Sequence, residues 1–143
     1  MKLTSKGRYA VTAMIDIALN QGTGPITLSL ISERQGISLS YLEQLFAKLK
    51  KADLVSSARG PGGGYRLSRP ADEISISDII HAVDEIIDAR KCGGKANCHG
   101  GEQCLSHELW SDLSMLIDSF LKGITLQSLM DKKVNNLKEI KFG

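Results

Sequence analysis

Three cysteines and one histidine in a glycine-rich stretch are the residues best suited to chemistry in this sequence. Residues 91–110 read KCGGKANCHGGEQCLSHELW and hold every cysteine of the chain, Cys92, Cys98 and Cys104, followed by His107. Thiolate sulfur and imidazole nitrogen select zinc, copper or iron–sulfur clusters. Because the intervening glycines let the backbone fold back on itself, we expect the four side chains to converge on one metal site.

The spacing leaves the kind of metal open. Structural zinc sites typically pair cysteines two to four residues apart, whereas five residues separate each cysteine here from the next. A two-iron cluster spans more chain and accepts mixed Cys and His ligation, so the spacing favours a cluster over zinc. His99 is a rival fourth ligand, but it directly follows Cys98, and adjacent residues rarely reach one metal. His107 follows Cys104 by three residues at the start of a predicted helix, so both face the same way.

Composition narrows the class of protein. The chain has 143 residues, of which 42% are hydrophobic and 24% charged, which is typical of a globular protein with a core of its own. The sequence contains neither a run of about 18 apolar residues nor a signal-peptide core, so we expect no membrane association. An odd, clustered set of cysteines indicates a reduced, cytoplasmic setting rather than a disulfide framework. Catalytic motifs are missing too, so an enzyme is not expected.

Charge divides the chain into a basic and an acidic half. Residues 1–69 hold ten Lys and Arg against four Asp and Glu, a net charge of +6, and residues 70–143 hold eight against twelve, a net charge of −4. A basic half joined to an acidic half is consistent with one half meeting a polyanion such as DNA. Unevenly charged but solvated surface would explain the same numbers.

The first half predicts a helix-turn-helix. Apolar spacing predicts a helix over 8–21, with Tyr9 in its apolar stripe, then a short helix from a Thr27 cap to about Arg34. Gly36 breaks the chain before a third helix, at 39–51. Leu42, Leu45, Phe46 and Leu49 recur along that helix as one buried face. A short helix, a glycine turn and a helix with a polar face form the helix-turn-helix pattern.

Two short strands, at 54–58 and 65–68, flank the glycine-rich stretch RGPGGG and predict a wing. The fold class is therefore mainly α with a small β wing: a winged helix-turn-helix domain at 1–70. We expect the helix at 39–51 to enter the major groove and the wing tip to reach the minor groove. The predicted DNA-binding residues are Ser38, Ser40, Tyr41, Glu43, Gln44, Lys48, Arg59, Gly60, Lys6 and Arg8.

Individual roles within this set follow from the groups they carry. Gln44 suits adenine, and Ser40 is permissive. Arg59 fits a narrow minor groove, and Lys6, Arg8 and Lys48 would contact phosphates. Glu43 is unusual on a DNA-facing surface, since phosphates repel a carboxylate, which can nevertheless accept from cytosine N4. We therefore hypothesise that Glu43 filters DNA sites.

The second half predicts a dimerisation region. Apolar spacing predicts a helix over 74–87, capped by Ser75 or Ser77, and a long helix over 105–121. A short turn of helix follows near 125–130. The long helix is apolar around more than half its circumference, which indicates two surfaces to bury and favours a homodimer interface over purely internal packing. We expect 71–130 to hold the metal loop and the dimerisation helices, and 131–143 to be a loose tail.

Taken together, these features resemble the Rrf2 family of bacterial transcription regulators. The resemblance covers nearly the whole chain, as far as about residue 130. It is carried by LTSKGRYAVTAM at 3–14, ISERQGISLSYLEQLF at 31–46, RGPGGGY at 59–65, AVDE at 82–85 and the loop with Cys92, Cys98, Cys104 and His107.

The resemblance implies a function and a cofactor. It implies a homodimer that holds a [2Fe–2S] cluster through Cys92, Cys98, Cys104 and His107. It also implies a regulator of iron–sulfur assembly genes that represses when loaded. The cluster-free form would bind a second class of DNA sites and activate there together with RNA polymerase.

Two other readings stay open. The nitric-oxide-sensing branch of the family shares the cysteine spacing, and there a carboxylate near the N-terminus can complete a [4Fe–4S] site. At the matching place this sequence has Arg8, with no acidic residue before Asp16, so His107 favours the [2Fe–2S] type of ligation. The other alternative is a DNA-binding module whose loop is stabilised by zinc.

Overall fold

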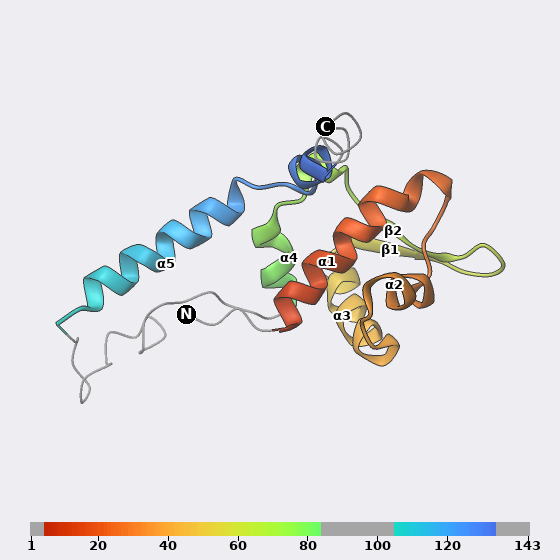
Figure 1. Cartoon of the computed structure of the whole chain (residues 1–143), viewed down its shortest axis with the longest axis horizontal. Coiled ribbons are helices and arrows are strands. Elements are labelled where there is room, and N and C mark those ends of the chain that lie inside the picture. The colour runs from red at the N-terminus through yellow and green to blue at the C-terminus, as the bar shows by residue number, and fades with distance from the viewer. Residues whose placement is uncertain (1–4, 84–104, 134–143) are drawn as a thin grey trace, which may run out of the picture.

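Helices pack beside a small antiparallel hairpin, whose tip projects to one side, in the computed structural model, which describes residues 5–83 and 105–133 (Figure 1). The mainly α fold with a β wing is confirmed. The chain forms α1 (Ser5–Asn20), α2 (Leu28–Gln35), α3 (Leu39–Lys51), β1 (Val55–Ala58), β2 (Gly64–Leu67), α4 (Ile76–Ala82), α5 (His107–Lys122) and two 3-10 turns, Gln21–Thr23 and Ala71–Glu73. A last helical stretch covers 126–133.

Helix α1 is the centre of the packing. It begins at Ser5, earlier than expected, and buries Ala10, Ala13, Met14 and Ile17 completely. Small alanines in this stripe let neighbouring helices approach closely. Tyr9 was assigned to the apolar stripe, but it is 40% exposed. Tyr9 lies one helical turn before the buried Ala13, at the N-terminal edge of the domain, where the core no longer covers the helix.

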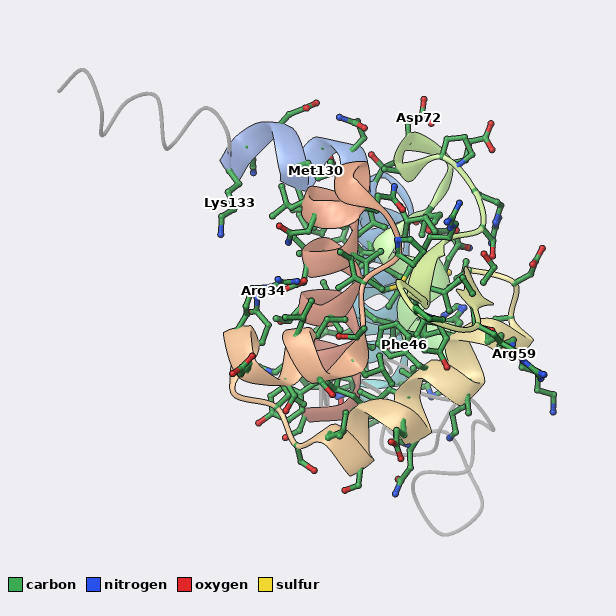
Figure 2. All side chains as sticks on the ribbon, turned by 90° about the vertical axis from the view of Figure 1, so that its right-hand side faces the viewer. Arg34, Phe46, Arg59, Asp72, Met130 and Lys133 are labelled. Atoms are coloured by element: carbon green, nitrogen blue, oxygen red, sulfur yellow. The ribbon has the colours of Figure 1, made fainter. Side chains whose placement is uncertain are left out.

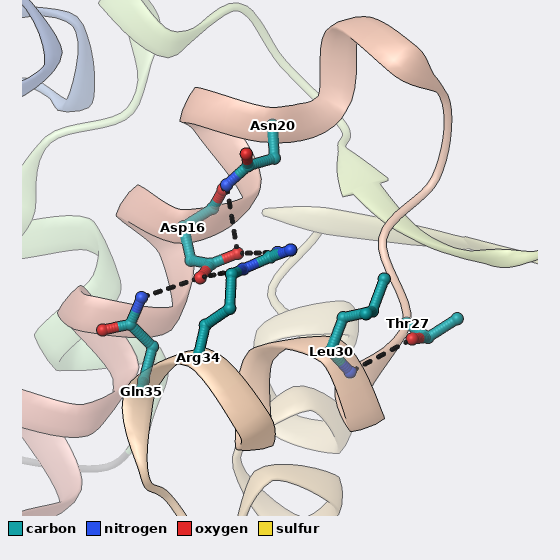
Figure 3. Close-up of polar contacts among 6 residues, drawn as sticks. All are labelled: Asp16, Asn20, Thr27, Leu30, Arg34 and Gln35. Carbon is teal, nitrogen blue, oxygen red and sulfur yellow. Dashed lines mark hydrogen bonds and ion pairs between the residues drawn. The ribbon is translucent and has the colours of Figure 1, made fainter.

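Capping residues set the ends of α2 and α3 as predicted. The Thr27 hydroxyl accepts a hydrogen bond from the Leu30 amide at 3.2 Å (Figure 3). Gly36 ends α2 in the left-handed region, with φ of 66°, where a side chain would be strained. The Ser38 hydroxyl accepts from the amide of Tyr41 at the start of α3. These two caps and the glycine fix the turn that orients α3 against α2.

The wing is an antiparallel hairpin whose base is joined to the helices. Val55 pairs with Leu67 and Ala58 with Gly64, so the first strand begins one residue later than the predicted 54–58, and the second lies one residue earlier than the predicted 65–68. Ile26 adds a bridge on the outer side, where its N–H donates to the Tyr65 carbonyl at 2.8 Å. A Cβ on Gly64 would lie 2.5 Å from the Ile26 carbonyl oxygen, so this close approach requires glycine.

The helices after the wing share the core formed by α1, α2 and α3. Helix α4 begins at Ile76 rather than at 74, because the Ser75 side chain and Asp78 form a capping box; residues 84–87 of the predicted helix lie outside the described residues. Ile74, Ile79, Val83 and Leu126 belong to one buried cluster with the α1–α3 core. The helical stretch 126–133 includes Asp131, Lys132 and Lys133, which were expected to belong to a loose tail.

A buried acidic side chain fastens α1 to α2. The Asp16 side chain is 1% exposed and pairs with Arg34, whose Nε donates to Oδ2 at 3.0 Å. Gln35 donates to the same carboxylate at 2.8 Å, and the Asn20 amide approaches it at 3.4 Å (Figure 3). Burial alone raises the pKa of Asp16. The hydrogen bonds from Arg34 and Gln35 and the positive charge of Arg34 together lower the pKa by more than burial raises it, so the pKa lies below its usual value.

We expect Asp16→Asn to lower the free energy of unfolding at pH 7 by about 1–3 kcal/mol, because it removes charge-assisted hydrogen bonds at a buried site. The value should fall toward the lower end of that range, since Arg34 is 37% exposed and partly screened by water. Urea denaturation measures the difference, with Glu33→Gln at an exposed position of α2 as the matched control.

The effect should also depend on pH with a defined sign. A lowered pKa in the folded state adds stability above the unfolded value of about 4, and this contribution disappears as pH falls toward the folded pKa. The stabilities of wild type and Asp16→Asn should therefore converge at acid pH. A constant difference from pH 7 to pH 3 would contradict this account of Asp16.

Candidate nucleic-acid interface and cluster ligands

Helix α3 presents one apolar and one polar face. Leu42, Leu45, Phe46 and Leu49 are at most 2% exposed, as the sequence predicts. The opposite side carries the solvent-exposed polar residues Ser40, Glu43 and Gln44. Tyr41 and Lys48 are half-buried at its margins. A helix held by its apolar face with short polar side chains near its N-terminal end has the form of a recognition helix.

The wing is attached rigidly to this helix. The rings of Phe46 and Tyr65 meet edge to face, with centroids 5.0 Å apart. On the surface, the Lys50 ammonium donates to the Ser57 hydroxyl at 2.8 Å and joins α3 to β1. The hairpin therefore cannot move independently of α3 without breaking both contacts.

Cationic groups extend from the recognition helix toward the wing tip and the start of α1. Arg59 is exposed and points outward from the hairpin, whereas Phe46 lies inside (Figure 2). Gly60 next to it has φ of 87°, which favours glycine. Lys6 is half-buried and Arg8 exposed in the first turn of α1. Such a spread of cations suits contacts to phosphates on both sides of a groove.

A hollow of about 520 Å³ separates the start of α1 from the start of α3. Predicted DNA-contacting residues form one wall. The whole lining is Ser5, Tyr9, Gly36, Ile37, Ser38, Ser40, Tyr41 and Gln44. Sequence reasoning missed Ser5, Tyr9 and Ile37, because periodicity assigned Tyr9 to the core and gave the other two no role. The signal that could have found Tyr9 is the place of a large aromatic at the N-terminal end of α1, beyond the alanine stripe.

The predicted metal ligands are only partly placed. Cys92, Cys98 and Cys104 lie outside the described residues, as does His99. His107 is the first residue of α5 and is 8% exposed. Within residues 5–83 and 105–133, no three His, Cys, Asp or Glu side chains are grouped closely enough to hold a metal ion. His107 fits a metal site by its chemistry, since a neutral imidazole is a common metal ligand.

The other described histidine belongs to a polar junction between α4 and α5. The Ser77 hydroxyl donates to Asp118 at 3.1 Å, His81 Nε2 lies 3.6 Å from the same oxygen, and Lys122 pairs with the second oxygen at 2.9 Å. The pKa of Asp118 lies below its usual value, mainly because Lys122 donates a hydrogen bond to its carboxylate. His81 is more than half exposed, in agreement with its assignment as a surface residue.

Helix α5 extends away from the other helices (Figure 1) and exposes an apolar face. The side chains of Leu109, Leu116 and Phe120 are 59%, 67% and 65% exposed. They recur at helical spacing on one side, while Ser114 and Asp118 face the body of the protein. Exposed apolar side chains contiguous along a helix mark an interaction surface. No helix in the described parts of the chain is both long and apolar enough to cross a bilayer.

Comparisons with known proteins agree with this arrangement. Residues 3–132 match the Rrf2 family, described as an iron-dependent transcriptional regulator. The HTH-type transcriptional regulator IscR of Aliivibrio salmonicida is 63% identical over 140 residues, which cover 97% of this chain and 83% of that protein.

Solved structures give the same assignment. T. potens IscR is 37% identical, with a TM-score of 0.76 over 93% of this chain and 88% of that one. CymR of B. subtilis, a global cysteine regulator, is 34% identical, with a TM-score of 0.80 over 92% of this chain and 98% of that one. The match to the family covers almost the whole of this chain, and the solved regulators share its winged-helix fold. The chain therefore belongs to the Rrf2 family of transcriptional regulators.

Proposed function

We propose that this protein is a DNA-binding transcription regulator that senses iron–sulfur clusters and controls the genes of cluster assembly. The observation that carries the proposal is the exposed polar face of α3, fastened to a wing with Arg59 exposed near its tip, in an Rrf2-family chain whose four soft ligands include the buried His107. The similarity to regulators named IscR supports the iron–sulfur part. No catalytic role is included in the proposal.

In the proposed complex, double-stranded DNA lies against α3 and the wing. Ser40 and Gln44 are exposed near the N-terminal end of α3, where a helix in the major groove reaches base edges. Ser38 and Tyr41 lie beside them, and Lys48 lies further along, suited to a phosphate. Arg59 and Gly60 reach the minor groove at the wing tip, where shape rather than sequence is read. Lys6 and Arg8 add backbone contacts.

Glu43 gives this surface its selectivity. It is exposed on the same face as Gln44 and forms no ion pair with another of the described residues. Facing a cytosine amino group it accepts a hydrogen bond, whereas facing an acceptor it leaves a desolvated carboxylate unpaired, which is costly. We therefore propose that Glu43 rejects one class of DNA sites more strongly than another.

The proposed cofactor is a [2Fe–2S] cluster held by Cys92, Cys98, Cys104 and His107. Three thiolates and an imidazole are a chemically suitable set for such a cluster, which would supply sensitivity to iron supply and oxidants. A neutral imidazole binds iron less firmly than a thiolate and releases it on protonation. That lability suits a sensor. His107 would contribute its imidazole nitrogen from the first residue of α5.

The exposed apolar face of α5 is the proposed homodimer interface. A two-fold pair would bury Leu109, Leu116 and Phe120 and would place two α3 helices for two DNA half-sites. The Asp118 junction ties α5 to α4, and α4 shares the core of the DNA-binding half. A change at the ligand end of α5 can therefore bias the spacing of the recognition helices, as far as the two states differ in cluster affinity.

Regulation then has two states, both proposed for the cytoplasm. The loaded form represses the cluster-assembly genes, and the cluster-free form binds a second class of sites, where it activates with RNA polymerase. Two alternative functions are a nitric-oxide-sensing repressor with another cluster and a DNA-binding module stabilised by zinc. Both use the same DNA-binding surface, and they differ from the proposed function in the metal that the loop holds.

We expect loaded and cluster-free protein to select different duplexes from random-sequence DNA, with the loaded form binding one class that the cluster-free form binds poorly. Glu43→Ala should reduce the discrimination between the two classes about tenfold, the effect of one base contact. Lys48→Ala should weaken both classes evenly and lower the salt slope by about 1. Fluorescence anisotropy under anaerobic conditions measures each affinity. Equal affinities of both forms for every selected duplex would contradict the proposal.

We expect replacement of both Leu116 and Phe120 by Asp to dissociate the dimer, because each change puts a charge where apolar surface would be buried. The dimer dissociation constant should rise by at least about a hundredfold. Ser119→Asp adds charge at a neighbouring exposed position without removing apolar area and is the matched control. Sedimentation velocity reports the change. A dimer unaffected by the double substitution would place the interface elsewhere.

A further inference from the structure

Tyr9 stands beside the recognition helix although it belongs to α1. Its ring centroid is 5.7 Å from that of Tyr41, and the two ring planes meet at 86°. This is the edge-to-face geometry that aromatic pairs prefer. We propose that Tyr9 is a positioning residue for DNA recognition, which holds the Tyr41 side chain in the orientation that reads the DNA. The inference rests on the proposed function.

Tyr41 needs such support because the core covers its side chain only in part. Its N–H is capped by the Ser38 hydroxyl at 3.4 Å, while its ring lies half-buried at the edge of the core. A ring that rotated freely would have to be ordered when DNA binds, at a cost in entropy. Contact with Tyr9 orders it beforehand, and such preorganisation improves binding without adding a contact to DNA.

The position of Tyr9 in the hollow explains why discrimination between DNA sequences should depend on Tyr9. Tyr9 and Ser5, one turn apart on α1, face Ser40, Tyr41 and Gln44 across this space. Without the Tyr9 ring the hollow widens on the α1 side, and Tyr41 gains room to turn away from the DNA. The neighbouring polar side chains then meet base edges in more than one arrangement.

A direct role for the Tyr9 hydroxyl predicts a different pattern. Tyr9 is 40% exposed, so its hydroxyl could donate to a phosphate. Phosphate contacts position a protein on any sequence and carry no base information. Loss of such a contact would weaken specific and non-specific binding together, whereas loss of the positioning contact lowers their ratio.

The test compares Tyr9→Ala, Tyr9→Phe, Tyr41→Ala and the Tyr9→Ala/Tyr41→Ala double variant. Each binds a duplex selected by the wild type from random DNA and a scrambled duplex of equal length. We expect Tyr9→Ala to lower the ratio of the two affinities about two- to tenfold, the worth of one aromatic pair. Tyr9→Phe keeps the ring and should restore most of the ratio. In the Tyr41→Ala background, Tyr9→Ala should change the ratio little further.

Leu30→Ala, which truncates an apolar side chain of similar exposure outside the hollow, is the control. Circular dichroism and sedimentation verify that each variant folds and assembles like the wild type. An unchanged ratio in Tyr9→Ala would overturn the inference while leaving the proposed function intact, as would an equal loss on both duplexes in Tyr9→Phe. A wild type without sequence preference would overturn both.

Discussion

Burial of one face of α3 is the constraint on which the rest of this structure depends. Leu42, Leu45, Phe46 and Leu49 exclude water against α1 and the neighbouring elements, so the opposite face of the helix must remain exposed. Because that face cannot turn inward, its polar groups are available to DNA. The same burial places the Phe46 ring against Tyr65 and so fixes the wing. The Asp16 network then sets the angle between α1 and α2, and with it the turn before α3.

The second consequence concerns communication between the two halves. Helix α4 contributes Ile76, Ile79 and Ile80 to the DNA-binding core, while its buried Ser77 and its exposed His81 meet Asp118 of α5. The helix that carries His107 is therefore connected to the recognition helix through packed elements rather than through a loose linker. Packed elements shift between discrete arrangements, which gives a site at one end of α5 a physical means of affecting the other end.

Most of the fold follows from local chemistry that a sequence displays. Strict apolar spacing gave α3, Thr27 and Ser38 marked helix starts, and Gly36 marked a helix end. Tyr9 and Asp16 escaped such reasoning, because periodicity cannot tell an aromatic at the edge of a core from one inside it, and an acidic residue in an apolar stripe reveals nothing of its partner 18 residues away. The ligand set Cys92, Cys98, Cys104 and His107 remains a prediction from residue type and spacing, with His107 alone among the described residues.

The most direct measurement of the central claim is an absorption and EPR spectrum of anaerobically purified protein, with iron, sulfide and zinc counted, beside Cys92→Ala and His107→Ala. The account predicts iron and sulfide in equal amounts, near two of each per chain, with a reducible chromophore that Cys92→Ala abolishes and His107→Ala weakens. Zinc without sulfide would contradict it and leave a DNA-binding protein with a structural metal. Near four iron per chain, indifferent to His107, would also contradict it and indicate the nitric-oxide-sensing branch.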